Sequence, residues 1–253
     1  MSKLPDFLIC GFQKCGTTAL SHNLNQHSRI KIPCTGHPKA KLSHGKEFNF
    51  FSSQQIETST TTEGIEWYKS HFQKDEFTWG EVSPSYSVYV PEVLQIMQKY
   101  LTDTKFVFSI RNPINRAFSA YNHYMQLLES NIKFGNWDPS KSFIEIVESN
   151  KYLFTLSYTN ALFQYEKTFC REKIHIAIQE KIDSDDYQEE YNKLFDFLNL
   201  KYETVNNNKI HSRDYIRQIS KNEIEFLKEL YREEVDELFN WMGREVSEWK
   251  EFC

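Results

Sequence analysis

The chain has 253 residues, of which 40% are hydrophobic, so it is long enough to bury one sizeable core. Its formal net charge of −5 lacks the basic excess of nucleic-acid-binding proteins, so nucleic acid is excluded as an expected partner. No apolar run approaches the roughly 18 residues that cross a bilayer, and the first residues, MSKLPDFLIC, have no signal-peptide pattern. We therefore expect a cytoplasmic protein without a membrane span, although a chain cut free of an anchor would have the same sequence.

The chain has an odd number of cysteines, which without a secretory signal favours reduced thiols: Cys10, Cys15, Cys34, Cys170 and Cys253. Cys34 and His37 are spaced like two metal ligands, but no second such pair completes a set of four. Packing is the favoured interpretation, and no metal is expected.

In chain order, short apolar runs alternate with segments of helical spacing. Strands are predicted at 6–10, 29–33, 77–81, 105–110 and 173–178. Helices are predicted at 17–27, 64–73, 91–100, 113–128, 141–149, 158–169, 186–198 and, after the capping box of Ser220 and Glu223, up to Gly243. The polar stretch 52–64 is predicted to be a loop. This alternation predicts a single α/β domain over 1–253, P-loop-like, with a central mostly parallel sheet flanked by helices.

The stretch GFQKCGTT, Gly11 to Thr18, lies between the first strand and the first helix. Its glycines permit a tight turn, and the N–H groups of Gly16, Thr17 and Thr18 open a helix whose positive dipole end favours an anion. In the usual triphosphate loop, GxxxxGK[ST], lysine follows the second glycine. Here Thr17 has that place and Lys14 lies inside the loop. A turn between strand and helix without any function is the alternative.

A second group of polar residues follows the strand FVFSI. Arg111 comes at the carboxyl end of that strand, and Asn112 and Pro113 are helix start signals. Arg116, Ser119 and His123 share the side of the helix opposite its apolar face. Arg111 with Ser119 suits a phosphate monoester at the crevice of a parallel sheet. Two phosphate sites predict a ligand phosphorylated at both ends, such as a nucleoside 3′,5′-bisphosphate.

These motifs carry a resemblance to a known family. GFQKCGTTAL resembles the 5′-phosphosulfate loop of the sulfotransferases that use 3′-phosphoadenosine 5′-phosphosulfate (PAPS), and RNPINRAFSAY resembles their 3′-phosphate motif. GKEFNFF resembles the signature of the heparan-sulfate and related bacterial carbohydrate sulfotransferases. GIEWYKSHF, GEVSPSYSV and the C-terminal helix follow the same branch, so that the resemblance covers roughly residues 5–250.

The resemblance implies a PAPS-dependent enzyme without a metal, releasing adenosine 3′,5′-bisphosphate (PAP). Glu47 would be the general base, and Lys14 would act on the bridging oxygen and the sulfuryl group. The alternative for Glu47 is a surface carboxylate paired with Lys46. The residues implied to contact the donor are Lys14, Cys15, Gly16, Thr17, Thr18, Arg111, Ser119, Tyr158 and Arg213. Of these, Tyr158 also suits a helix core, and Arg213 lies with His211 where relatives carry a loop over the cofactor.

The sequence departs from the branch at two places. Relatives usually carry a lysine where this chain has Val82, so that either Lys46 or His44 replaces it or the contact with the acceptor differs. The segment 34–45 looks longer than its counterpart and either meets an acidic acceptor or is an ordinary solvated loop. Lys46, His44 and His123 are the candidate acceptor contacts.

Two other functions compete with sulfuryl transfer. A P-loop kinase would need lysine at Thr17 and an acidic Mg²⁺ ligand, whereas the strand 105–110 is followed by Arg111. A non-catalytic module that binds a nucleotide or a glycan would not need Glu47. The expected acceptor is a small molecule or an oligosaccharide, and a lipid head group also stays open. The sequence fixes neither the identity of the acceptor, nor sulfation at oxygen or at nitrogen, nor the oligomeric state.

Overall fold

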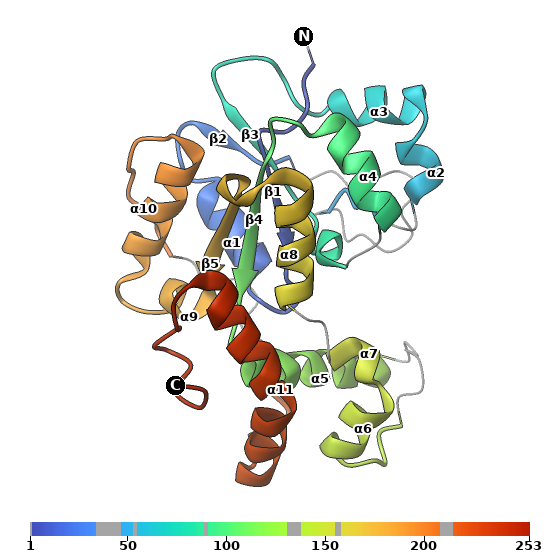
Figure 1. The fold of residues 1–253 in the computed structure, drawn as a ribbon, viewed down its shortest axis with the longest axis vertical. Helices are drawn as coiled ribbons and strands as arrows, with labels where there is room; N and C mark the ends of the chain where they lie inside the picture. The colour runs from blue at the N-terminus through green and yellow to red at the C-terminus, as the bar shows by residue number, and fades with distance from the viewer. Residues whose placement is uncertain are drawn as a thin grey trace. The chain divides into compact units, whose positions relative to one another are not determined.

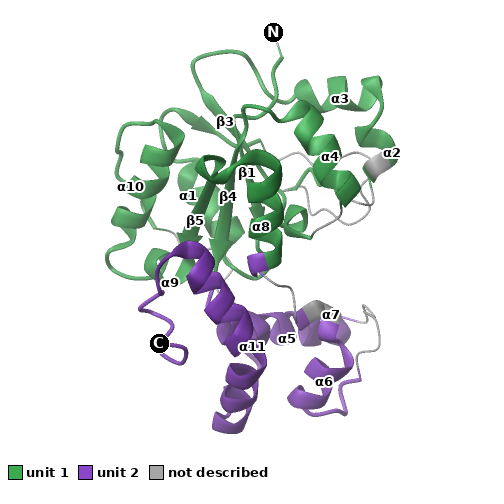
Figure 2. Cartoon of the chain, in the orientation of Figure 1, with its two compact units in different colours: residues 1–110, 160–211 green, residues 111–159, 212–253 purple. Residues whose placement is uncertain are grey.

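The structure is a computed structural model, and it describes residues 2–33, 47–52, 55–88, 91–130, 138–154, 158–207 and 215–253. The chain divides into two compact units, shown in different colours in Figure 2. Unit 1 comprises Met1–Ile110 and Asn160–His211, and unit 2 comprises Arg111–Thr159 and Ser212–Cys253. This division into units does not test whether residues 1–253 form a single sulfotransferase domain, which stays a prediction.

Unit 1 is built on a parallel sheet of five strands in the order β2-β3-β1-β4-β5 (Figure 1). The strands are β1 (Phe7–Gly11), β2 (Ile30–Lys31), β3 (Thr78–Val82), β4 (Lys105–Ile110) and β5 (Ile174–Ile178). All five predicted strands and the parallel α/β sheet are confirmed. The central strand β1 is buried along its whole length, as expected of a strand that helices cover on both faces.

Helices cover both faces of this sheet (Figure 1). On one face, α1 (Thr17–Leu24) and α10 (Tyr187–Leu198) share a core with β1, which includes Ile9, Leu20 and Leu194. On the other face, α8 (Tyr158–Phe169) packs Tyr165 against Phe108, with ring centroids 4.9 Å apart. The described residues of unit 1 also form α2 (Ile56–Ser59), α3 (Thr62–Lys69), η2 (Pro84–Ser87), α4 (Pro91–Tyr100), η3 (Arg171–Lys173) and α9 (Gln179–Ile182).

The prediction of a continuous loop over 52–64 was wrong. Helix α2 forms inside this segment, and α3 begins at Thr62 rather than Gly64. The Thr61 side chain accepts a hydrogen bond of 3.0 Å from the Gly64 amide and so acts as the N-cap of α3. Polar composition indicated a loop, but threonine is also a favoured capping residue, and capping decides where α3 starts.

Unit 2 is helical in the residues described. Its elements are α5 (Pro113–Glu129), α6 (Phe143–Ser149), α7 (Lys151–Phe154) and α11 (Lys221–Met242). The predicted helix signals are confirmed: the Asn112 side chain accepts from the Ile114 amide at 3.0 Å, and Ser220 with Glu223 forms a capping box. Gly243 ends α11 with a left-handed φ of 68°.

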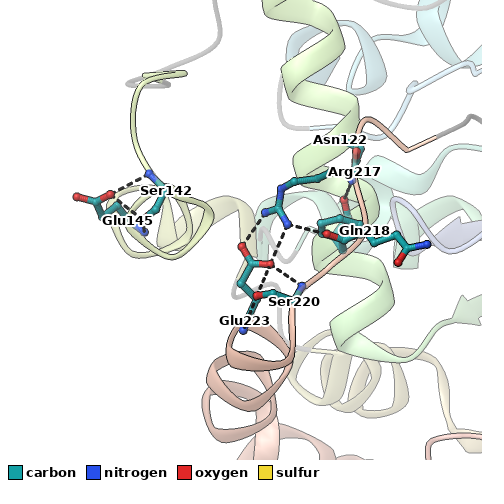
Figure 3. Close-up of polar contacts among 8 residues, drawn as sticks. Asn122, Ser142, Glu145, Arg217, Gln218, Ser220 and Glu223 are labelled. Atoms are coloured by element: carbon teal, nitrogen blue, oxygen red, sulfur yellow. Dashed lines mark hydrogen bonds and ion pairs between the residues drawn. The ribbon is translucent and has the colours of Figure 1, made fainter.

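Unit 2 contains an ion pair beside this capping box, drawn in Figure 3. Arg217 donates to both carboxylate oxygens of Glu223, at 2.7 and 2.8 Å, and its guanidinium lies over the ring of Phe118 at 5.2 Å. Burial alone would raise the pKa of Glu223, but the bonds from Arg217 and Ser220 outweigh burial and lower the pKa. The α6 capping box of Ser142 and Glu145 has the same form.

Candidate active site

The loop between β1 and α1 is fastened to the neighbouring strand β4 and to η2. The Phe12 amide donates to the Ser109 carbonyl at 2.9 Å, and the Ser109 hydroxyl donates to the Cys15 carbonyl at 2.6 Å. Gly11 packs against η2 so closely that a Cβ added there would lie 2.6 Å from the Cβ of Ser87. The loop therefore has one fixed path, and this path leads directly into the amino end of α1.

The amino end of α1 is open to an anion. Gly16 is the residue before the helix, with a left-handed φ of 73°, and within the described chain no side chain caps this end and no acidic residue lies in the first turn. The left-handed φ favours glycine, and a Cβ at Gly16 would also lie 1.9 Å from Oε1 of Gln179, so that this side chain would have to move. Lys14 also has a left-handed φ, of 66°, and its side chain is partly exposed. Backbone N–H groups, the helix dipole and a lysine fit a phosphate group.

Three phenylalanines anchor the segment that carries Glu47. Phe48, Phe50 and Phe51 are all buried, and the Phe50 ring stacks on the Tyr68 ring of α3 at 4.5 Å with an angle of 7°. Glu47 itself is partly buried. Lys46 and His44 lie outside the described residues, and so do Arg213, His211 and the segment 34–45.

Asn49 connects Glu47 to η2. Its side-chain amide donates to Oε2 of Glu47 at 3.4 Å, and its side-chain oxygen accepts from the Ser85 hydroxyl. Asn49 has a left-handed φ of 50°, which asparagine tolerates better than most residues. Since η2 also packs against Gly11, through Ser87, one short turn contacts both the start of the Gly11–Thr18 loop and the segment of Glu47.

The sequence analysis missed the group at the centre of this region, Glu81 on β3. Its carboxyl is completely buried and accepts hydrogen bonds from the hydroxyls of Ser83 at 2.6 Å, Tyr86 at 2.8 Å and Tyr68. Burial raises the pKa of Glu81 to about 7, although the three hydroxyls oppose this rise. The available signal was a charged residue inside an otherwise apolar strand, FTWGEV, because such a charge needs buried partners.

In unit 2, the predicted 3′-phosphate residues lie on and before α5. Arg111 and Ser119 are both partly exposed, and Arg111 Nη2 lies 3.4 Å from the hydroxyl of Tyr215. Tyr158 is completely buried, and its hydroxyl donates to the main-chain carbonyl of Arg111 at 2.8 Å. Tyr158 therefore supports the backbone at Arg111, which agrees with a core residue beside the predicted site.

The predicted polar side of α5 needs one correction. Arg116 is buried rather than exposed beside Ser119, and its guanidinium lies 5.4 Å from the ring centroid of Tyr158. Glu234 of α11 is close enough for the charge of Arg116 to lower its pKa, although burial has the larger effect and leaves that pKa raised. His123 is partly exposed, with its ring 5.6 Å from that of Tyr124. The helical period placed Arg116 with the polar residues, but aromatic and acidic partners from distant segments draw it inside.

Val82, where the branch usually has a lysine, is 5% exposed and belongs to the core shared by α1 and α10. A lysine at this position would need a charged partner or a path to solvent. The valine is therefore a packing residue of β3.

The comparison with protein families decides the identity of this fold. The profile of the family described as "Sulfotransferase domain" matches residues 4–251. The chain belongs to this family. The match runs through both compact units of the sulfotransferase domain.

A solved relative and two curated relatives agree with this assignment. The crystal structure of a sulfotransferase from Alicyclobacillus acidocaldarius is 25% identical, with a TM-score of 0.71, and the match covers 97% of this chain and 98% of that one. Heparan sulfate glucosamine 3-O-sulfotransferase 5 of Mus musculus is 27% identical over 183 residues, 70% of this chain and 48% of the relative. Membrane-associated sulfotransferase kil1 of Dictyostelium discoideum is 30% identical over 133 residues, 51% of this chain and 25% of that protein.

This sulfotransferase domain spans at most about half the length of the curated relatives it matches. In the portion of the chain that the structure describes, no helix is both long and apolar enough to cross a membrane.

Proposed function

We propose that this sulfotransferase domain moves the sulfuryl group of PAPS to a hydroxyl or amine of an acceptor. The observation that carries the proposal is the loop before α1. It ends at Gly16 in a helix start that none of the described side chains caps, and Lys14 lies inside the turn instead of after the second glycine. A lysine inside the turn reaches beyond the first phosphate toward the group attached to it. A triphosphate loop places its lysine elsewhere.

The residues of the loop would hold the 5′ end of the donor. The amides of Gly16, Thr17 and Thr18 surround the helix end, and of the two threonines Thr18 is the more exposed and the better placed to donate its hydroxyl. Arg111 and Ser119 would bind the 3′-phosphate, because arginine and a hydroxyl give charge-assisted bonds to a monoester. This second assignment is supported by the motif RNPINRAFSAY and by the direct attachment of Arg111 to the end of β4.

Glu47 would accept the proton of the acceptor. The acceptor oxygen or nitrogen bonds to sulfur, the bond from sulfur to the 5′-phosphate oxygen breaks, and PAP leaves with the electron pair. Lys14 would stabilise the negative charge that grows on that phosphate oxygen. Such a transfer depends on position and charge more than on covalent chemistry by the protein, as in phosphoryl transfer. The hydrogen bond from Asn49 to Glu47 supports this assignment because it orients the carboxylate.

The acceptor that we propose is a carbohydrate. The support is the segment KEFNFF, which resembles the carbohydrate branch, together with the curated relative named as a heparan sulfate glucosamine sulfotransferase. His123 on α5 is a candidate contact because it is partly exposed, and Lys46 and His44 remain predictions from the sequence.

A transfer assay with PAPS tests the proposal. The protein is incubated with PAPS and a panel of sugar, amino-sugar and small-molecule acceptors in EDTA, and products are detected by mass spectrometry as the gain of one sulfo group. We expect transfer to a carbohydrate and release of PAP. A parallel incubation with ATP and Mg²⁺ provides the control. Phosphorylated product there, without sulfated product from PAPS, would contradict the proposal and favour a kinase.

A further inference from the structure

Hydrogen bonds connect Glu81 to the segment that carries Glu47, and the donor and acceptor of each bond can be assigned. An ionised carboxylate only accepts hydrogen bonds, so the hydroxyls of Ser83, Tyr86 and Tyr68 must all donate to it. The oxygens of Ser83 and Tyr86 are then available as acceptors. Ser83 accepts from the Asn49 amide at 2.9 Å, and Tyr86 accepts from the Phe51 amide at 3.2 Å.

We propose that Glu81 is the positioning residue for Glu47: its buried carboxylate fixes the direction of the Ser83 and Tyr86 hydroxyls, which in turn hold the backbone of Asn49 and Phe51 on either side of the turn that orients Glu47. The hydrogen bond from the Asn49 side chain to Oε2 of Glu47 completes the connection. This inference rests on the proposed function, in which Glu47 is the general base.

Adding a proton to Glu81 would disturb this arrangement. A protonated carboxyl, like the amide of glutamine, carries a donor, which must meet an acceptor. On Oε1 this donor opposes the hydroxyls of Ser83 and Tyr86, and on Oε2 it opposes the hydroxyl of Tyr68. On either oxygen the negative charge is lost, so the bonds from Ser83 and Tyr86 lose their charge assistance and fix the direction of these hydroxyls less firmly. Glu47 is then oriented less well, although the loop that binds the donor is unchanged.

The surroundings of Glu81 make its charge easy to change. Among the described residues, the groups that act on it are Tyr68 of α3, Tyr86 of η2, Glu47, and, less directly, Cys10 of β1 and Tyr165 of α8. None of these groups is a cation, and Glu47 carries the same sign of charge. We therefore expect the position of Glu47 to depend on pH close to neutrality, where the burial of Glu81 sets its pKa, at about 7.

Three variants test the proposal. Glu81→Gln keeps the shape of the side chain and adds a donor, and Tyr86→Phe removes the acceptor of the Phe51 amide. Tyr68→Phe is the matched control, because it also removes one hydroxyl from Glu81 while the ring that stacks on Phe50 remains. For each protein we would measure kcat with its pH profile, KM for PAPS, PAP binding by calorimetry, and hydrogen exchange of single amides.

We expect Glu81→Gln and Tyr86→Phe to lower kcat roughly 10-fold or more, and Tyr68→Phe by only about 2- to 3-fold. KM for PAPS and the Kd of PAP should change less than about 2-fold, since the loop keeps its own bonds to Ser109. The fall of kcat on the acidic side should move to lower pH in Glu81→Gln. A kcat that falls equally in Tyr68→Phe and Tyr86→Phe, or an unmoved pH profile, would overturn the proposal.

Amide exchange tests the inference without any activity measurement. In Glu81→Gln, exchange at Asn49 and Phe51 should be at least about 10-fold faster, whereas the Phe12 amide, bonded to Ser109, should keep its protection. If the variants do not fold, the wild-type protein is used, and exchange at the two amides, corrected for its intrinsic pH dependence, should increase as pH falls from 8 to 6. Unchanged relative protection of the two amides would refute the positioning role of Glu81. If the amides exchange as expected but no sulfuryl transfer is detected, only the sulfotransferase function is refuted.

Discussion

Each unit of the molecule holds a carboxylate within a set of hydrogen bonds, and the two carboxylates behave in opposite ways. Glu223 in unit 2 has a guanidinium beside it and keeps 14% of its side-chain surface exposed, and its pKa is lowered. Glu81 in unit 1 is fully buried among hydroxyls, and burial raises its pKa. Hydroxyl donors alone do not replace a counter-charge in a buried site.

Because of this difference, the Arg217–Glu223 ion pair stabilises the fold, whereas Glu81 can gain or lose a proton near neutral pH. Arg217 keeps Glu223 ionised well into the acidic range, so the ion pair and the start of α11 are constant at working pH. Glu81 lies at the middle of its titration near neutrality and is connected through Ser83 and Asn49 to Glu47. The comparison therefore predicts that substitutions around Glu81 change catalysis, whereas those around Glu223 change stability and leave catalysis unchanged.

The largest effect is expected from Glu47→Gln. Because the proposed general base is lost, kcat should fall by about 10²- to 10⁴-fold, while PAP binds with nearly the wild-type Kd. Glu57→Gln, on the exposed surface of α2, provides the control and should retain activity. Loss of PAP binding in Glu47→Gln would show instead that Glu47 has a structural role.

The next largest effect is expected at Gly16, and Gly243 of unit 2 is its matched control. Both have a left-handed φ, of 73° and 68°, but only Gly16 has a neighbour, Gln179, where a Cβ would lie. Gly243→Ala should lower the free energy of unfolding by about 1–2 kcal/mol through backbone strain alone. Gly16→Ala should cost roughly 1–3 kcal/mol more and should weaken PAP binding at least about 10-fold. Equal losses of stability in urea, with PAP binding intact, would contradict the described loop.

A smaller effect is expected from removing the counter-charge in unit 2. Arg217→Gln leaves Glu223 partly buried without its cation, and we expect a loss of about 1–2 kcal/mol in the free energy of unfolding. This loss should come with unchanged kcat and an unchanged pH profile. Lys69→Gln, which breaks the exposed pair with Glu66, should change stability by less than about 1 kcal/mol. A shifted pH profile of kcat in Arg217→Gln would contradict the prediction that the residues around Glu223 affect stability and not catalysis.

The pH dependence of stability should show the same contrast. Because the pKa of Glu81 is raised to about 7, the folded state binds this proton more tightly than the unfolded chain, so stability falls as pH rises from about 5 to 8. The pKa of Glu223 is lowered, so its contribution is present at neutral pH and is lost as pH falls. In thermal melts, Glu81→Gln should remove part of the decline above pH 5, and Glu223→Gln should not. An identical slope in Glu81→Gln and wild type would contradict the raised pKa.

Most of the fold could be predicted from the sequence because its signals are local. The five apolar runs became the five strands, and Asn112, Ser220 and Gly243 mark helix ends as predicted. The loop of Gly11 to Thr18 was also recognisable, since its glycines and lysine are contiguous. The assigned roles of its residues stay predictions.

The contacts that depend on distant segments could not be predicted in this way. The partners of Glu81 come from α3 and η2, and a single-residue pattern does not say that two tyrosines and a serine will surround one glutamate. Arg116 shows the same limit, because the helical period gives its angle around α5 but not the ring of Tyr158 that covers it. The polar composition around Thr61 predicts a loop, but the Thr61 side chain accepts a hydrogen bond from the Gly64 amide and caps α3.

A crystal structure of the protein with PAP tests the central claim most directly. We predict that the 5′-phosphate lies at the amino end of α1, within hydrogen-bonding distance of the Gly16 and Thr17 amides, with the Lys14 ammonium beside it. PAP bound away from this loop, or Lys14 turned away from the 5′-phosphate, would contradict the account.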